Sequence, residues 1–143
     1  MKKQPLTFFR PDMEAGTSLP LVSHRVSAGF ASPAQDFLQD RIDLNKMLVK
    51  NPLTTFYIRV AGNSMINAGI ADGDLLVVDR SLEPADGKIA ICLIDGDFTV
   101  KRLKVEPDCI YLMPENPAYK PIKVTEDNNL TIWGIVTYVV KSL

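Results

Sequence analysis

The stretch Val60-Ala61-Gly62-Asn63-Ser64-Met65 marks the point at which an apolar strand of this chain ends. It follows Phe56-Tyr57-Ile58-Arg59-Val60, a run typical of a β-strand, and the Gly-Asn pair favours a turn directly after it. A side chain in such a corner is exposed, so Ser64 is available either as a helix cap or as a nucleophile. A serine hydroxyl needs an adjacent base at neutral pH, and a desolvated lysine can be that base. The choice between the two roles therefore depends on a suitable lysine.

Lys101 is the candidate base. The segment from Asp97 to Val105 alternates as a β-strand and contains three basic residues. Lys101 shares a face with Leu103 and Val105, whereas the other two basic side chains point to the opposite face. Burial lowers a lysine pKa and converts the ammonium into a potential base. The alternative is a lysine that lays its stem along the sheet and keeps its charge in water.

Three segments together carry a family resemblance: Gly62-Asn63-Ser64-Met65, the stretch from Gly69 to Asp79, and Gly96-Asp97-Phe98-Thr99-Val100-Lys101. They resemble the self-cleaving Ser-Lys proteases of the LexA and UmuD type, and the serine-to-lysine separation is similar to theirs. The resemblance covers nearly the whole chain and is closest to the UmuD type. It implies that Ser64 and Lys101 are catalytic. We expect the backbone N–H groups of Ser64 and Met65 to stabilise the oxyanion, as in acyl transfer generally.

The UmuD resemblance also implies partners. Members of that type are accessory subunits of error-prone Y-family translesion DNA polymerases in the SOS response to DNA damage. It implies that a RecA-ssDNA filament stimulates self-cleavage, and that the processed chain forms a homodimer and joins a UmuC-like polymerase subunit. Two alternatives stay open: a non-cleaving regulatory binding module of the same fold, and a Ser-Lys protease that acts on other chains.

Residues 1–31 are expected to form a flexible arm that contains the cleavage site, followed by a peptidase domain over 32–143. Val26-Ser27-Ala28-Gly29-Phe30 resembles the cleavage segment of the family, which places the scissile bond between Ala28 and Gly29. Ala-Gly occurs four times in the chain, so this choice depends on the flanking residues and on family position. His24 is the only histidine and would leave with the cleaved arm, so we expect no Ser-His-Asp triad.

Composition narrows the function further. The 143 residues suffice for one domain with a tail, and 16 basic against 17 acidic residues form no basic block. We therefore expect no direct sequence-specific DNA binding, and too few residues precede Ser64 for the DNA-binding domain of a LexA-type repressor. Pro5, Arg10 and Pro11 interrupt any N-terminal apolar stretch, so we expect neither a signal peptide nor a membrane span, in contrast to the membrane-anchored type I signal peptidases.

The cysteines and acidic residues do not suggest a metal site or another cofactor. Cys92 and Cys109 lie in apolar surroundings without metal-ligand spacing, which favours reduced thiols in a cytoplasmic protein over a disulfide. Asp72, Asp74 and Asp79 form an acidic cluster, but Asp-Gly-Asp is a common turn signature. We assign neither a metal nor a cofactor.

The expected fold is mostly β, a curved and largely antiparallel LexA-like peptidase domain with a short N-terminal helix and an extended cleavable arm. Ser32-Pro33 predicts the start of an amphipathic helix that ends near Asn51-Pro52, with a break near Asp43 left open. Strands are predicted over 55–60, 74–79, 87–94, 97–105, 109–114, 121–124 and 130–140, with Asp95-Gly96 as a two-residue hairpin turn. The last strand is nearly uncharged and is predicted to be an edge that a second copy covers.

Overall fold

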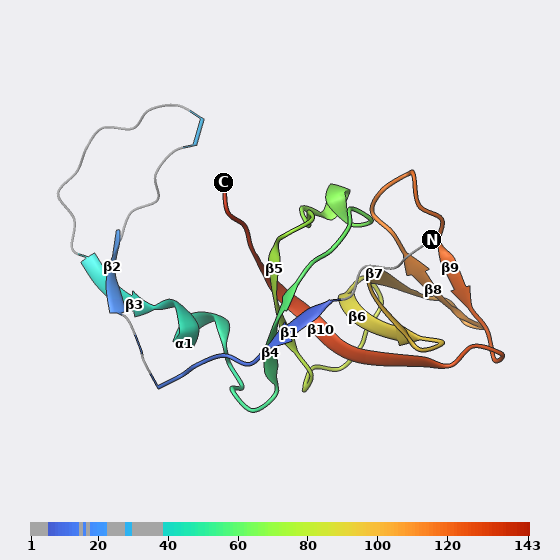
Figure 1. Cartoon of the computed structure of the whole chain (residues 1–143), viewed down its shortest axis with the longest axis horizontal. Helices are drawn as coiled ribbons and strands as arrows, with labels where there is room; N and C mark the ends of the chain where they lie inside the picture. Colours follow the sequence, from blue (N-terminus) through green and yellow to red (C-terminus); the bar gives the residue numbers. More distant parts are fainter. Residues whose placement is uncertain (1–5, 15, 17, 23–27, 30–38) are drawn as a thin grey trace. The chain divides into compact units, whose positions relative to one another are not determined.

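A computed structural model describes residues 6–14, 16, 18–22, 28–29 and 39–143 of the chain (Figure 1). The chain divides into two compact units. The larger unit comprises residues 1–11 and 51–143, and the smaller comprises residues 12–50.

The larger unit is built on an eight-stranded sheet that is antiparallel throughout and not closed. Its spatial order is β1-β4-β5-β10-β6-β7-β8-β9. The strands are β1 (Thr7–Phe9), β4 (Thr55–Arg59), β5 (Leu75–Asp79), β6 (Ile89–Ile94), β7 (Asp97–Val105), β8 (Ile110–Met113), β9 (Ile122–Val124) and β10 (Leu130–Val140). The predicted mostly β, largely antiparallel fold is therefore confirmed, and each strand predicted from Thr55 onward is present with ends within about two residues.

The turn between β6 and β7 is the predicted Asp95-Gly96 pair. Both residues have positive φ, +48° for Asp95 and +87° for Gly96. Two consecutive left-handed residues define the tight hairpin turn whose twist matches that of the flanking strands. This turn sets the register in which Ala90 of β6 lies opposite Lys101 of β7.

The prediction that β10 is an edge strand is wrong. β10 lies between β5 and β6, pairing with β6 through residues 130–135 and with β5 through residues 135–140. Gly134 lies beside the shift in the register with β6. A Cβ atom at this position would meet Val78 Cγ1 at 2.6 Å, so β10 and β5 approach each other closely here. A nearly uncharged strand is also typical of the centre of a sheet, where both neighbours pair with it, so the lack of charge did not identify an edge.

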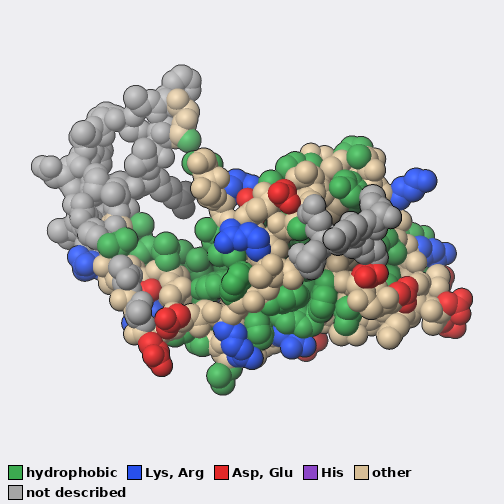
Figure 2. Space-filling model, viewed as in Figure 1, with side chains coloured by type: hydrophobic (Ala, Val, Ile, Leu, Met, Phe, Trp, Pro, Cys, Tyr) green, Lys and Arg blue, Asp and Glu red, His purple; other side chains and the backbone are tan. Residues whose placement is uncertain are grey.

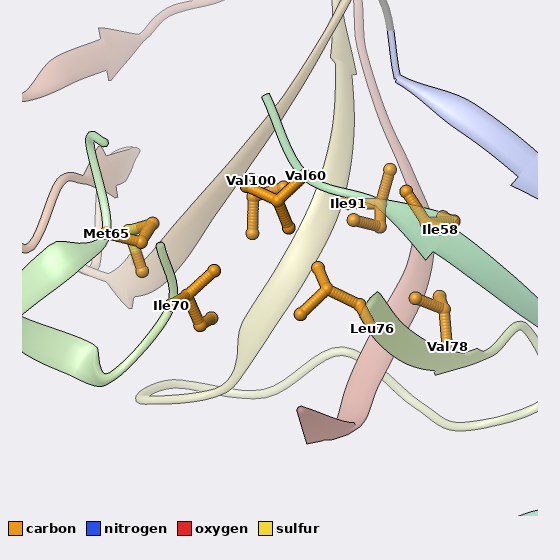
Figure 3. Packing of buried hydrophobic residues seen from close by; sticks show 8 residues of the cluster. All are labelled: Ile58, Val60, Met65, Ile70, Leu76, Val78, Ile91 and Val100. Carbon is orange, nitrogen blue, oxygen red and sulfur yellow. The ribbon is translucent and has the colours of Figure 1, made fainter. Parts of the chain in front are cut away.

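Two hydrophobic clusters form the core of the larger unit. The first surrounds Ile58, Leu76 and Ile91 and also includes Met65, the residue after Ser64 (Figure 3). The second contains Ala90, Cys92 and Leu103. Burying one such aliphatic side chain stabilises a fold by about 1.5–3 kcal/mol. Buried side chains such as Ile58 and Leu103 therefore stabilise β4, which precedes Ser64, and β7, which carries Lys101.

The N-terminal segment contains strands that the sequence did not predict. β1 pairs with β4 in the main sheet, with Phe8 opposite Ile58. In the smaller unit, β2 (Ser18–Val22) pairs antiparallel with β3 (Gln39–Asp43). Each strand is three or five residues long. Segments this short carry too few alternating positions to be recognised without their pairing partners.

The predicted helix needs correction. Residues 39–43, within its predicted range, form β3, and α-helix appears over α1 (Leu44–Leu48). Asp43 ends the strand and caps the helix, since its carboxylate accepts a hydrogen bond from Asn45 N at 3.0 Å. Pairing with β2 therefore overrides the helical spacing before Asp43. Residues 32–38, where the helix was predicted to begin, lie outside the described residues.

Surface charges of both signs are mixed (Figure 2), and the two cysteines are free. On the face seen in Figure 2, basic and acidic side chains are interspersed rather than gathered into a block. Cys92 is buried and Cys109 half-buried, and both are free thiols. No helix in the described ranges is both long and apolar enough to cross a bilayer.

Candidate active site

The loop that carries Ser64 begins where β4 leaves the sheet. Val60 N donates to Asp74 O and Gly73 N donates to Val60 O, both at 2.8 Å, which ties the end of the strand to the next turn. Gly62 then adopts φ +90°, a left-handed conformation that would be strained if this position carried a side chain. Its N–H donates to Asp72 Oδ1 at 2.8 Å. The sharp turn presents Ser64 just before the 3₁₀ helix η1 (Ile66–Ala68).

A second loop, which contains Glu115 and Asn116, holds the serine in place. Glu115 N donates to Ser64 O, and Glu115 O accepts from Asn67 N, both at 2.8 Å. The Asn116 amide donates to Asn63 O at 2.8 Å. The carbonyls on both sides of the Ser64 nitrogen are thus fixed, so the orientation of the serine backbone is determined by this second loop.

Lys101 extends from β7 to the serine. Its Nζ lies 3.0 Å from Ser64 Oγ, 2.6 Å from Thr99 Oγ1 and 3.2 Å from Val100 O. Thr99 precedes Lys101 by two positions on the same strand and so shares its face. Three oxygen atoms therefore surround the nitrogen, of which one is the serine hydroxyl.

The surroundings of Lys101 favour the neutral amine. The side chain is buried, with 6% of the residue exposed. The alternative of a lysine that lays its stem along the sheet and keeps its charge in water is therefore wrong. This burial lowers the pKa of Lys101, and a thiolate at Cys92 would oppose the shift. The Cys92 thiol is itself buried, which raises its pKa to about 12, so it is uncharged at neutral pH. Of the ion pairs in the described part of the chain, none includes Lys101.

The three contacts suit a general base. A neutral amine has two N–H donors and one lone pair. Thr99 Oγ1 and Val100 O are acceptors for the two N–H groups, which leaves the lone pair for the Ser64 hydroxyl proton. In this state Ser64 donates to Lys101, the direction needed to activate the oxygen. The arrangement can therefore deprotonate a serine without a histidine.

A pocket of 570 Å³ opens in front of the serine. Its wall includes the loop from Val60 to Met65, the strand residues from Asp97 to Lys101, and four further apolar or aromatic side chains, Leu6, Ile94, Tyr119 and Ile122. Within the described residues, the backbone N–H groups of Ser64 and Met65 donate to no carbonyl or side chain. A pocket with apolar walls and free N–H donors beside a serine can hold an extended peptide and its developing oxyanion.

The structure brings together some of the predicted site residues. Ser64, Met65 and Lys101 meet in the larger unit. Ala28 and Gly29 belong to the smaller unit, where both are exposed, and a Cβ built on Gly29 would meet no atom within 4 Å beyond its two chain neighbours. His24 and the two residues that supported the choice of this bond, Val26 and Phe30, lie outside the described residues.

Sequence reasoning missed four residues that shape the site: Thr99, Asp72, Arg102 and Glu115. The strand period placed Thr99 on the face of Lys101, and a hydroxyl two positions before a buried lysine was the available signal. Asp72 was identified only with a turn, yet its carboxylate accepts from Gly62 N. Arg102 and Glu115 form an ion pair at 2.6 Å, which no sequence pattern indicated because it joins separate segments.

The acidic cluster considered as a metal site has other contacts. Asp74 accepts from Ala71 N at 2.8 Å and pairs with Lys141. Asp79 accepts from Thr54 and Ser81 hydroxyls at 2.8 and 2.7 Å. Within the ranges that the structure describes, no three histidine, cysteine or acidic side chains are grouped to hold a metal ion.

Comparison with known proteins gives clear relatives. The Peptidase S24-like family matches residues 20–137, a range that contains Ser64, Lys101 and the Ala28-Gly29 bond. Protein SamA from Salmonella typhimurium LT2 is 42% identical over 133 residues, 92% of each chain. Protein MucA from Escherichia coli is 43% identical over 123 residues, 85% of this chain and 83% of MucA. The LexA repressor of Erwinia tasmaniensis is 38% identical over 131 residues, 91% of this chain and 64% of the repressor.

Proposed function

Because this chain belongs to the Peptidase S24-like family, as an SOS-related, self-cleaving serine peptidase of the UmuD type, we propose that Ser64 is its nucleophile and Lys101 its general base. The bond that they cut is the chain's own Ala28-Gly29 bond. The observation that carries this proposal is the 3.0 Å contact between Lys101 Nζ and Ser64 Oγ at a buried lysine.

The proposed reaction has two stages. Ser64 Oγ attacks the Ala28 carbonyl carbon as Lys101 takes the hydroxyl proton, and the N–H groups of Ser64 and Met65 stabilise the oxyanion. The C–N bond then breaks, Lys101 protonates the Gly29 amine, and residues 1–28 remain as an ester on Ser64. A water molecule, deprotonated by Lys101, hydrolyses the ester and restores the serine.

The proposed organisation places the cleavage site in an arm, residues 1–31, before a peptidase domain over 32–143. Small side chains at Ala28 and Gly29 let the scissile backbone approach the nucleophile closely. The exposure of both residues supports their accessibility to such a site. Docking of this segment would exclude water from Lys101 and lower its pKa further, so that cleavage depends on how often the segment is docked.

The biological role that we propose is regulation of translesion synthesis in the cytoplasm. A RecA-ssDNA filament stimulates cleavage by favouring the docked segment. The product, residues 29–143, then forms a homodimer and serves as an accessory subunit of an error-prone, UmuC-like Y-family polymerase. The motif resemblance to the UmuD type is the support for these partners.

The homodimer has one further support in the structure. The last residues of β10 expose apolar side chains, with Tyr138 40% and Val140 44% exposed. In the described part of the chain, residues 136–140 pair with β5 and have no second partner strand. Such a half-paired apolar strand is a suitable surface for a second copy.

Incubation of the purified protein, with intact masses measured over time, tests the proposed cleavage. We expect two products, residues 1–28 and 29–143, and no product from Ser64→Ala or Lys101→Ala. The double variant should be no worse than either single variant, because the two residues act as a unit. Lys104→Ala is the matched control, since Lys104 is on the same strand but exposed.

Each alternative outcome has a distinct meaning in this experiment. A chain that stays whole under all conditions would indicate a non-cleaving binding module. A chain that cuts added proteins but not itself would indicate a protease for other substrates. A product that begins at Gly16 would show that another Ala-Gly bond is cut, and Gly29→Glu, which we expect to block cleavage, would then have no effect.

A further inference from the structure

We propose that self-cleavage uncovers a strand-acceptor site along β4, and that this site binds an extended peptide segment of a partner protein with an aliphatic, an aromatic and a basic side chain at alternate positions. The site is at present filled by β1 of the chain itself. The proposal rests on the proposed function only for the event that releases β1.

The first step is how β1 is held. It pairs with β4 in three positions, with Thr7 opposite Arg59, Phe8 opposite Ile58 and Phe9 opposite Tyr57. It is the outermost strand on its side of the sheet. A three-residue edge strand is weak by itself, because few backbone hydrogen bonds and side chains hold it. It remains in place because the chain tethers it.

The second step is what β1 covers. Phe8 packs against two rings, with ring centroids 5.1 Å from Phe98 and 5.0 Å from Trp133. Trp133 also meets Phe56 at 5.0 Å, so the three rings beneath Phe8 form one aromatic cluster. Hydrophobic side chains gather over the region of β1 and β4 in Figure 2, which has the same view as Figure 1.

The third step is the side-chain pattern of β1. Three alternate residues, Leu6, Phe8 and Arg10, contact the body of the larger unit. Leu6 lines the pocket that contains Ser64, and the guanidinium of Arg10 lies 4.7 Å from the centre of the Phe56 ring. Phe9, between them, is 48% exposed. The site therefore fits an extended segment with an aliphatic, an aromatic and a cationic side chain at alternate positions.

The fourth step is the effect of cleavage. A cut after Ala28 leaves β1 on a separate peptide of 28 residues, so its local concentration falls from on the order of millimolar to that of the protein in solution. The separated peptide is then held only by the three pairs of β1 with β4 and the five pairs of β2 with β3, and we expect it to dissociate. The edge of β4 and the aromatic cluster are exposed together, which gives main-chain hydrogen bonding and an apolar surface to a partner strand. Self-cleavage would thus create a binding site as well as remove a segment.

An engineered cut tests the site independently of self-cleavage. A recognition sequence for a specific protease is inserted after Glu14 in a Ser64→Ala chain, which stays whole until the protease is added. Trp133 is the only tryptophan, so its emission reports directly on the aromatic cluster. We expect the cut to shift the emission to longer wavelength, and a synthetic peptide of residues 6–12 to bind and reverse the shift.

Matched peptides and variants complete the test. A peptide with Phe8→Ala should bind at least about tenfold more weakly, since the contacts of Phe8 with two rings are lost, whereas Phe9→Ala should bind within about twofold. In the uncut Ser64→Ala chain, Phe8→Asp should release β1 and permit binding of the peptide, and Phe9→Asp should not. Circular dichroism confirms that each variant is folded.

Two results would overturn the proposal: unchanged Trp133 emission after the cut, or equal binding of the Phe8→Ala and Phe9→Ala peptides. The test also separates this inference from the proposed function. If the wild-type chain never cuts itself but the engineered cut opens the site, the acceptor site exists and the proposed self-cleavage fails. If self-cleavage proceeds and the emission is unchanged, only the acceptor site fails.

Discussion

Arg102 Nε lies 2.6 Å from Glu115 Oε1, and this ion pair joins the strand that carries Lys101 to the loop whose backbone holds Ser64. The two catalytic candidates come from separate parts of the chain, so their distance depends on connections of this kind. Glu115 contributes twice, because its backbone N–H also donates to Ser64 O. The ion pair therefore has a positioning role in addition to any effect on stability.

Glu115→Gln should slow self-cleavage modestly and leave the melting temperature nearly unchanged. Both partners are about one-third exposed, and such pairs contribute no more than about 1 kcal/mol, or roughly fivefold in rate. Glu106→Gln, which removes the exposed pair between Lys104 and Glu106, is the matched control and should have no effect. Rates from intact masses measure both. An equal effect of the two variants would argue against a positioning role.

Thr99→Val should slow cleavage by about tenfold to a hundredfold, a part of the roughly 10²–10⁴-fold that a well-placed general base contributes. The valine has the same shape but removes the acceptor 2.6 Å from Lys101 Nζ, so the lone pair is no longer directed at Ser64. Thr99→Ser keeps the hydroxyl and should restore most of the rate. Similar rates for the two variants would show that packing, rather than the hydrogen bond, is the function of this residue.

Lys101→Met should raise the melting temperature at neutral pH while it abolishes cleavage. Burial lowers the pKa of Lys101 in the folded protein, so the unfolded chain binds a proton more tightly and the lysine destabilises the fold at low and neutral pH. This cost diminishes as the pH rises toward the ordinary lysine value of 10.5. Thermal melts at pH 7 and pH 10.5 should therefore show a larger gain at pH 7. An equal gain at both values would contradict a lowered pKa.

Tyr138→Glu should weaken the proposed homodimer. Tyr138 is on the exposed, half-paired end of β10, and a carboxylate there would lose hydration in a contact between two copies. Sedimentation equilibrium at micromolar concentration is the measurement, with Thr131→Glu as a control on the other half of the same strand. A parent protein that sediments as a monomer would exclude the dimer at this concentration.

The sequence was sufficient for the strands of the larger unit from Thr55 onward and for the expectation that Ser64 and Lys101 lie together. Strong alternation and turn residues such as Asp95-Gly96 are local signals, so they can be recognised in the sequence without knowledge of the fold. The central place of β10 and the pairing of β1 with β4 depend on contacts between distant segments. The contacts of Glu115 with Ser64 and Arg102 also join segments that are distant in sequence, so its positioning role could not be predicted.

The dependence of the self-cleavage rate on pH tests the central claim most directly, because it reports the protonation state of the base. Rates are measured from pH 6 to 10.5 for the wild type, Lys101→Ala and the control Lys104→Ala. We expect the wild type and the control to rise with pH toward a plateau, with a midpoint below 10.5 because burial lowers the pKa of Lys101, and Lys101→Ala to stay flat and near zero. A flat wild-type profile, a bell centred near the histidine pKa of about 6.5, or normal cleavage by Lys101→Ala would contradict the account.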